Sequence, residues 1–218
     1  MRFSLYSSTL VLLILIVFTF TQKAHAQQIF HLSFDPAYYI YNSDQFGDEA
    51  DNSHLTWAFG GSATMQTDFG RWPVTFSVGY QQGSQAVHSV RQTIGTGSYD
   101  YELIYRSLPV EILLRREFHD RITLSGGINL VGQHRITRVE GLDIADDRLM
   151  SFGAGVSGRA QFDLTANSDS PFGFLVTLKA RWTPFLFHDA GNRHLDDFNL
   201  QHVVITPGLA ISYNFAQR

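Results

Sequence analysis

Several charged side chains stand inside stretches that otherwise suit hydrophobic strands. In FLVTLKARWTPF, residues 174–185, Lys179 and Arg181 are two residues apart, which places both on one face of a β-strand. The opposite face carries apolar side chains: Phe174, Val176, Leu178, Ala180 and Trp182. Other alternating stretches also carry charged residues on the face opposite their apolar side chains: Arg115, Arg159, Asp35, Glu111 and Asp163. Either these charges meet water, or they pair with one another inside a closed structure.

Candidate metal ligands and nucleophiles also occur, but without the spacing of known sites. Two loops are rich in such residues: HDAGNRHLDD, with His188, Asp189, His194, Asp196 and Asp197, and DQFGDEAD, with Asp44, Asp48, Glu49 and Asp51. Neither contains an HExxH motif or an EF-hand series. His88 and Ser89 are adjacent, so on a strand they point to opposite faces and do not form a simple base–nucleophile pair. We therefore expect no catalytic residue, no metal site and no cofactor.

Alternation of apolar and polar residues dominates the chain after residue 27. We identify eight alternating segments: 28–41, 54–68, 72–84, 99–118, 122–134, 150–164, 174–185 and 201–215. Each is long enough for a strand tilted across a bilayer, which needs about 9–11 residues. A soluble β-sandwich also alternates, but its strands commonly have about five or six residues. In segment 99–118 the apolar parity changes near Arg106 and Ser107, which predicts a bulge before Pro109.

The connections between these segments alternate between long and short. The long ones are NSDQFGDEADNS, SQAVHSVRQTIGTG, HRITRVEGLDIADDR and FHDAGNRHLDDFN, and the short ones are FGRW, REFHDR and ANSDSPF. Membrane-spanning barrels have short periplasmic turns and longer external loops. The fold class predicted is therefore all-β: an eight-stranded antiparallel transmembrane up-and-down β-barrel, with four external loops and both termini periplasmic.

In such a barrel the apolar parity faces lipid and the other parity faces the interior. An interior of eight strands is only wide enough to be filled by side chains. We expect a lumen charge network of seven residues, padded by small polar side chains and glycine: Asp35, Glu111, Arg115, Arg159, Asp163, Lys179 and Arg181. Aromatic residues should form girdles at both rims. The outer rim is predicted to hold Trp57, Phe59, Tyr80, Tyr99, Tyr101, Phe185 and Phe187, and the periplasmic rim Phe30, Trp72, Phe118, Phe172, Tyr213 and Phe215.

The first 26 residues have the organisation of a cleaved signal peptide. Arg2 precedes an apolar run over residues 10–20, and Ala24-His25-Ala26 forms a small-residue cleavage site. A membrane anchor is the alternative, but the run is shorter than the roughly 20 residues that a spanning helix needs. We expect a barrel domain over 27–218, with 192 of the 218 residues. Without Arg2 and Lys23 it has 14 basic and 20 acidic residues, a formal charge of −6 that argues against nucleic acid as a partner.

Segment YRSLPVEILLRREF places Tyr105 four residues before Pro109 and continues as an alternating strand with basic residues at its end. It resembles the fourth strand of PorT-like outer-membrane β-barrel domains, and SFGAGVSGRAQFDL and GLAISYNF are similar in style. This resemblance implies a small eight-stranded barrel in a gram-negative outer membrane and maps no catalytic residue here. One departure is the end of the chain, where Ala-Gln-Arg follows Phe215 instead of the aromatic terminus read by the assembly machinery.

These observations favour a non-enzymatic integral outer-membrane protein whose lumen is plugged by paired charges. Its role would be structural or adhesive, carried by the external loops, whose ligand is unknown. The partners expected are outer-membrane lipid, lipopolysaccharide and the barrel-assembly machinery. Two alternatives stay open at this point: an outer-leaflet lipid-modifying enzyme and a narrow channel through the arginine-lined interior.

Overall fold

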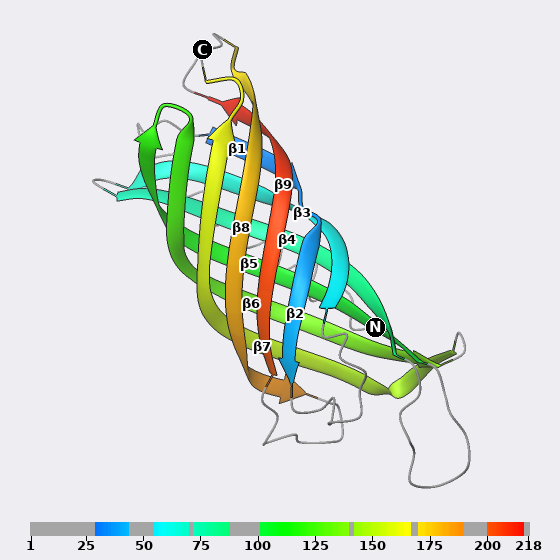
Figure 1. Ribbon diagram of the computed structural model, residues 1–218. Helices are drawn as coiled ribbons and strands as arrows, with labels where there is room; N and C mark the ends of the chain where they lie inside the picture. The colour runs from blue at the N-terminus through cyan, green and yellow to red at the C-terminus, as the bar shows by residue number, and fades with distance from the viewer. Residues whose placement is uncertain are drawn as a thin grey trace, which may run out of the picture.

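The computed structural model describes residues 29–43, 55–69, 72–87, 101–139, 142–166, 170–189 and 200–215. Their regular structure is entirely antiparallel β-sheet (Figure 1). The strands are β1 (Ile29–Phe34), β2 (Ala37–Ser43), β3 (Leu55–Phe69), β4 (Trp72–Val87), β5 (Tyr101–His119), β6 (Ile122–Val139), β7 (Leu142–Asp163), β8 (Phe172–Asp189) and β9 (Leu200–Asn214). No helix within these ranges is long and apolar enough to span a membrane. The predicted signal peptide lies outside the described residues.

The strands close into a ring in which sequence neighbours are also spatial neighbours. From β3 to β9 each strand pairs with the next, and β9 returns to pair with β1 and β2. Figure 1 shows this closure where β9, in red, lies beside β2, in blue. Because β1 and β2 both lie between β3 and β9, they occupy one position, and the ring has eight. The predicted eight-stranded antiparallel up-and-down barrel is confirmed.

The ring closes with a stagger of ten residues. Directly paired residues can be followed from one strand to the next around the ring. A path that starts at Phe30 returns to the first strand position at Ile40. It passes through Met65, Phe76, Ile112, Ile128, Val156, Trp182 and Val203. A closed barrel requires such a shear, which tilts the strands and decides which side chains meet across the interior.

Pro36 interrupts the first strand position, which the alternation predicted as one strand over 28–41. Proline has no backbone N–H, so the ladder loses a hydrogen bond where it stands. The break does not shift the register, since Phe34 pairs with Gly61 before it and Ala37 with Ala58 after it. The backbone N–H of Asp35 still donates to the carbonyl of Gly60, at 2.8 Å. The single predicted strand is therefore two short strands in one line.

The bulge predicted before Pro109 is absent. On the β4 side, Ser107 pairs with Gln81 and Val110 with Val78, in one constant register. On the β6 side, pairing runs without a shift from Tyr101 to Glu117. The apparent change of parity arises because Tyr105 faces the interior and is buried, although the sequence pattern placed it on the outer face.

The segment 134–148, predicted as a long loop, is mostly strand. β6 continues to Val139 and β7 begins at Leu142, so only residues 140 and 141 separate them. The paired β6 and β7 therefore extend as a hairpin beyond the expected strand ends, with a register shift between Ile136 and Arg138. The other three predicted long connections fall largely outside the described residues.

The two faces of the ring differ sharply in character. Along β8, Phe174, Leu178 and Trp182 are exposed on the outside, whereas Thr177, Lys179 and Arg181 are buried on the inside. The same apolar-out alternation holds on the neighbouring strands. Their exposed side chains include Ile112, Leu114, Ile128, Leu130, Val156, Leu209 and Ile211. The barrel is thus apolar outside and polar within, the reverse of a soluble protein.

Candidate functional site

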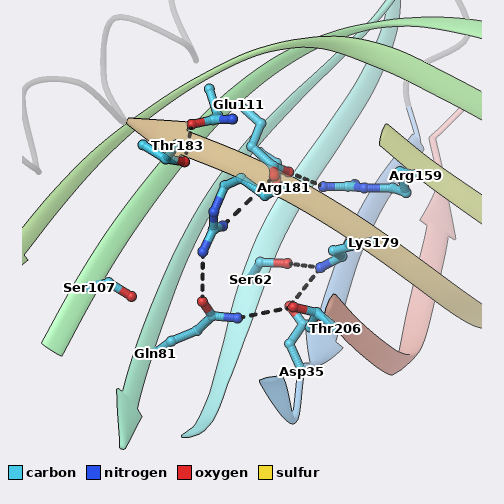
Figure 2. A network of polar contacts seen from close by, with 12 residues as sticks. Asp35, Ser62, Gln81, Ser107, Glu111, Arg159, Lys179, Arg181, Thr183 and Thr206 are labelled. Carbon is cyan, nitrogen blue, oxygen red and sulfur yellow. Dashed lines mark hydrogen bonds and ion pairs between the residues drawn. The ribbon is translucent and has the colours of Figure 1, made fainter. Parts of the chain in front are cut away.

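Lys179 and Asp35 form the shortest ion pair of the described interior. Nζ of Lys179 lies 2.6 Å from Oδ2 of Asp35 and also donates to the hydroxyls of Ser62 and Ser33, at 2.7 and 3.3 Å (Figure 2). All three ammonium donors therefore have acceptors. A Cβ at position 208 would lie 2.6 Å from Oδ1 of Asp35, so Gly208 on the adjacent strand leaves the room that this carboxylate occupies.

Glu111 is the second acidic centre and lies between two arginines. Its Oε2 accepts from Nη2 of Arg159 at 2.8 Å, and its Oε1 lies 3.9 Å from Nη1 of Arg181. All three side chains are buried, with at most 7 % of each side chain exposed. Arg181 also donates to Oε1 of Gln81, at 3.0 Å, and Arg159 to the hydroxyl of Thr64, at 3.1 Å.

We call Asp35, Glu111, Arg159, Lys179 and Arg181 the central ion cluster. Four strand positions supply these residues: the first position, β5, β7 and β8. Lys179 and Arg181 are neighbours on β8, and the fold brings them together with residues far away in sequence, such as Asp35 and Glu111 (Figure 2). A cavity of about 20 Å³ is lined by four of them: Asp35, Glu111, Lys179 and Arg181. That is roughly the space of one water molecule. The cluster therefore fills this level of the interior.

The other two members of the predicted charge network lie outside this cluster. Arg115 lies nearer the short-turn end, where it donates to Asp68 at 3.1 Å and to the side-chain oxygen of Gln66 at 2.8 Å. Asp163 accepts from the backbone N–H and the hydroxyl of Thr165, at 2.7 and 2.9 Å, so it caps the turn after β7. Five of the seven predicted residues thus form the central ion cluster. Arg115 contacts polar groups near the short-turn end, and Asp163 caps a turn.

An aromatic layer lies between the central ion cluster and the end where the long connections begin. It comprises Tyr39, Tyr105, Phe185 and His202, packed with Val131 and Val204, and all six are buried. The ring centroids of Phe185 and His202 are 4.5 Å apart, and those of Tyr39 and His202 are 5.9 Å apart. The hydroxyl of Tyr39 donates to Gln81 at 2.5 Å and lies 2.6 Å from that of Ser107, which links the layer to the cluster.

One expectation about an aromatic residue is therefore wrong. Phe185 was predicted at the outer rim, but it lies on the same parity of β8 as Lys179 and Arg181, and its buried ring points inward. Small polar side chains line the interior as predicted, among them Ser77, Asn129, Thr177 and Thr206, and the aromatic layer adds larger side chains that were not predicted there. The remaining rim residues that the structure describes lie on the outer face, among them Trp57, Phe59, Tyr80, Phe187, Trp72 and Phe118.

A serine–histidine contact also occurs, between residues that the sequence did not pair. Ser151 on β7 and His188 on β8 are directly opposite, and Oγ of Ser151 lies 2.9 Å from Nδ1 of His188. Such a pair resembles the nucleophile and base of a hydrolase. However, only 1 % of Ser151 is exposed, so an ester cannot reach its hydroxyl in this structure. We therefore interpret the contact as a cross-strand hydrogen bond.

The described residues hold no group of three or more His, Cys, Asp or Glu arranged to bind a metal ion. The acidic stretch 44–51 and most of the loop after His188 lie outside the described ranges, so their predicted lack of a metal site stays a prediction.

Sequence reasoning missed Tyr39 and Tyr105 as interior residues, whereas the alternation of segment 201–215 already placed His202 on the inward parity. Each stands on the inward parity of its strand, beside residues such as Ala37, Ser107 and Thr206. The available signal was the parity itself, which marks Tyr39 as inward once the strand is fixed. Tyr105 was misplaced because it was counted with Tyr101 and Leu103 on the apolar, outward parity of segment 99–118.

Comparison with known proteins reveals similarity to small barrels of bacterial surfaces at low sequence identity. Neisserial surface protein A matches with a TM-score of 0.48 and 11% identity over 85% of this chain and 97% of that chain. The attachment invasion locus protein Ail of Yersinia pestis matches with 0.48 and 14% over 86% and 99%. A major outer membrane protein from Thermus thermophilus matches with 0.48 and 12% over 88% and 100%. No family model and no curated protein matches the sequence.

Proposed function

We propose that this chain is an integral β-barrel protein of a gram-negative outer membrane. The observation that carries the proposal is the closed ring with its apolar exterior. Exposed apolar patches larger than a few hundred Å² are rare on soluble monomers and mark surfaces that contact lipid or partners. Here exposed apolar side chains surround a ring of strands whose backbone groups pair from strand to strand. A β-structure that spans a bilayer must be closed in this way. The outer surface is thus suited to lipid.

The barrel is neither a channel nor an enzyme in this proposal. Two consecutive layers occupy its interior, the central ion cluster and the aromatic layer, and both are buried. The two ends of the barrel are the parts that remain in contact with solvent. We therefore assign its work, structural or adhesive, to the end that bears the long connections, as an external surface. Lipopolysaccharide and the barrel-assembly machinery are its proposed partners, and the PorT-like domains are its proposed family.

In this proposal residues 1–26 are a signal peptide and both ends of the barrel domain are periplasmic. The eight strand positions support the second point, because an even number of crossings returns the chain to the side on which it started. The end with short turns, such as the one between His119 and Ile122, is then the periplasmic end.

Planar-bilayer recording tests the sealed interior. We expect folded protein to give no steady unitary conductance at neutral pH, because the central ion cluster leaves a cavity of only about 20 Å³. The comparison is the Phe185→Ala variant, folded to the same extent. This substitution opens the aromatic layer but leaves the central ion cluster intact. A stable conductance of the unmodified protein would contradict the proposal and favour the channel.

A further inference from the structure

Two prolines face each other at the seam of the barrel, where β9 pairs with β1 and β2. The register is the same on both sides of the break at Pro36, and it places Pro207 of β9 directly opposite. Within the described strands, the last pair before the break is Phe34 with Leu209, and the next pair after it is Tyr38 with Ile205. The ladder between β9 and the first strand position is thus interrupted at the two prolines.

The direction of the backbone groups removes two hydrogen bonds at this pair instead of one. Successive residues of a strand direct their N–H and C=O groups alternately to the two neighbouring strands. The N–H of Asp35 donates to β3, at 2.8 Å, so the groups of the next residue, Pro36, face β9. The N–H of Asn214 donates to Pro171, immediately before β8, at 2.9 Å, so Pro207, an odd number of positions away, faces the first strand position. Since proline has no N–H, both carbonyls face the seam without a ladder donor.

Two buried side-chain oxygens lie beside this pair without a hydrogen-bond donor among the described residues. They are Oδ1 of Asp35 and Oγ1 of Thr177, and both residues are at most 3 % exposed. Each oxygen lies 2.6 Å from the place where a Cβ on Gly208 would be, so the two oxygens are no more than twice that distance apart. One water molecule can contact both, because a hydrogen bond between oxygens spans about 2.8 Å.

The chemistry of these groups suits a neutral hydrogen-bond donor of the size of water. The two proline carbonyls and the carboxylate oxygen only accept hydrogen bonds, and the hydroxyl of Thr177 both accepts and donates. A set of oxygens also suits a metal cation. Here a cation is disfavoured, because the other oxygen of Asp35 already binds the ammonium of Lys179 at 2.6 Å (Figure 2). The central ion cluster, moreover, has three cations for two carboxylates.

We propose that a water molecule is bound in the barrel wall at the seam, between Asp35, Thr177 and the proline pair. It donates to Oδ1 of Asp35 and to a proline carbonyl, and it accepts from the hydroxyl of Thr177. Three hydrogen bonds are typical of a buried water. The barrel is then filled by side chains along its axis but hydrated at one point of its wall. The inference needs the closed ring, and it does not need the proposed membrane location.

Cross-relaxation between water and the α-protons of Gly208 tests the bound water. It is measured by NMR on the folded full-length protein in detergent micelles, and we expect the cross-peak of a long-lived water. The Thr177→Val variant is measured in parallel, because a hydroxyl proton that exchanges with water produces the same signal. The cross-peak should persist in this variant. Its absence from the unmodified protein, or its loss together with the hydroxyl, would overturn the site.

Amide hydrogen exchange tests the interruption of the ladder. The N–H groups of Leu209 and Ile205 face the first strand position on either side of Pro207, in the middle of β9. Amides in the middle of an intact strand are normally the most protected. We expect these two to exchange at least about tenfold faster than the amide of Ile128, in the middle of β6, the factor that about one missing hydrogen bond gives. Equal protection at the three positions would contradict the proposal.

Pro207→Ala supplies an N–H opposite Pro36 and should slow exchange at Leu209 and Ile205 about tenfold. Pro184→Ala is the matched control, because Pro184 lies on the neighbouring β8 and is paired with Gln201, which has an N–H of its own. This control should leave the two exchange rates unchanged. Equal effects of the two substitutions would count against the proline pair, and rates that change when choline replaces sodium at constant ionic strength would mean a bound cation instead of water.

Discussion

Glu111→Ala should destabilise the folded barrel by about 3–5 kcal/mol, the cost typical of removing one partner from a buried ion pair. Glu111 is the acid nearest to both Arg159 and Arg181, at 2.8 and 3.9 Å. Its removal leaves two buried guanidinium groups without their nearest carboxylate. Urea unfolding in detergent micelles, followed by tryptophan fluorescence, measures the change.

Glu117→Ala is the control for this substitution. Glu117 is also paired with an arginine, Arg115, at 3.9 Å, but 71% of its side chain is exposed. Exposed pairs contribute at most about 1 kcal/mol, so this variant should unfold almost as the unmodified protein does. Equal losses in the two variants would mean that Glu111 is not enclosed as the structure places it.

Gly155→Ala should cost about 3 kcal/mol or more, at or above the upper part of the range for overpacked cores. Gly155 faces the interior on β7, and a Cβ there would lie 2.0 Å from the carbonyl oxygen of Trp182 on β8. Since the atom that it meets belongs to the backbone, two paired strands would have to separate. The fraction of protein that shows heat-dependent gel migration after refolding gives the measurement.

Gly158→Ala, three residues along the same strand, is its matched control. There the nearest atom to an added Cβ is the carbonyl oxygen of Ser125, at 3.9 Å, which is an ordinary contact. This variant should refold as the unmodified protein does. If Gly155→Ala refolds equally well, the close approach of β7 and β8 is not present in the folded protein.

Much of the barrel could be predicted from alternation alone, because a strand with lipid on one side and a packed interior on the other must alternate. β3, β4 and β9 begin and end within three residues of their predicted bounds. The misses have physical causes. Pro36 breaks a ladder without changing its register, and the pattern of 134–148 is too polar to suggest that β6 and β7 remain paired there.

The pairing inside the barrel could be predicted only in part. Parity alone indicates that Lys179 and Arg181 point inward, since that requires only the period of a strand. It does not indicate that Lys179 reaches Asp35, 144 residues away, while Arg181 reaches Glu111. Those partners depend on the ten-residue stagger of the closed ring, which no local pattern encodes. Aromatic residues such as Phe185 were misplaced for the related reason that residue type does not determine the face.

The most direct test of the account is site-directed spin labelling along β8, in a chain that contains no cysteine of its own. Single cysteines at Val176 and Leu178 would carry labels on the outside, and one at Thr177 would carry a label inside. In lipid bilayers we expect the first two labels to be relaxed by dissolved oxygen and shielded from a water-soluble nickel complex, with the third immobilised and reached by neither. Strong relaxation of the Val176 and Leu178 labels by the nickel complex would contradict a lipid-facing exterior.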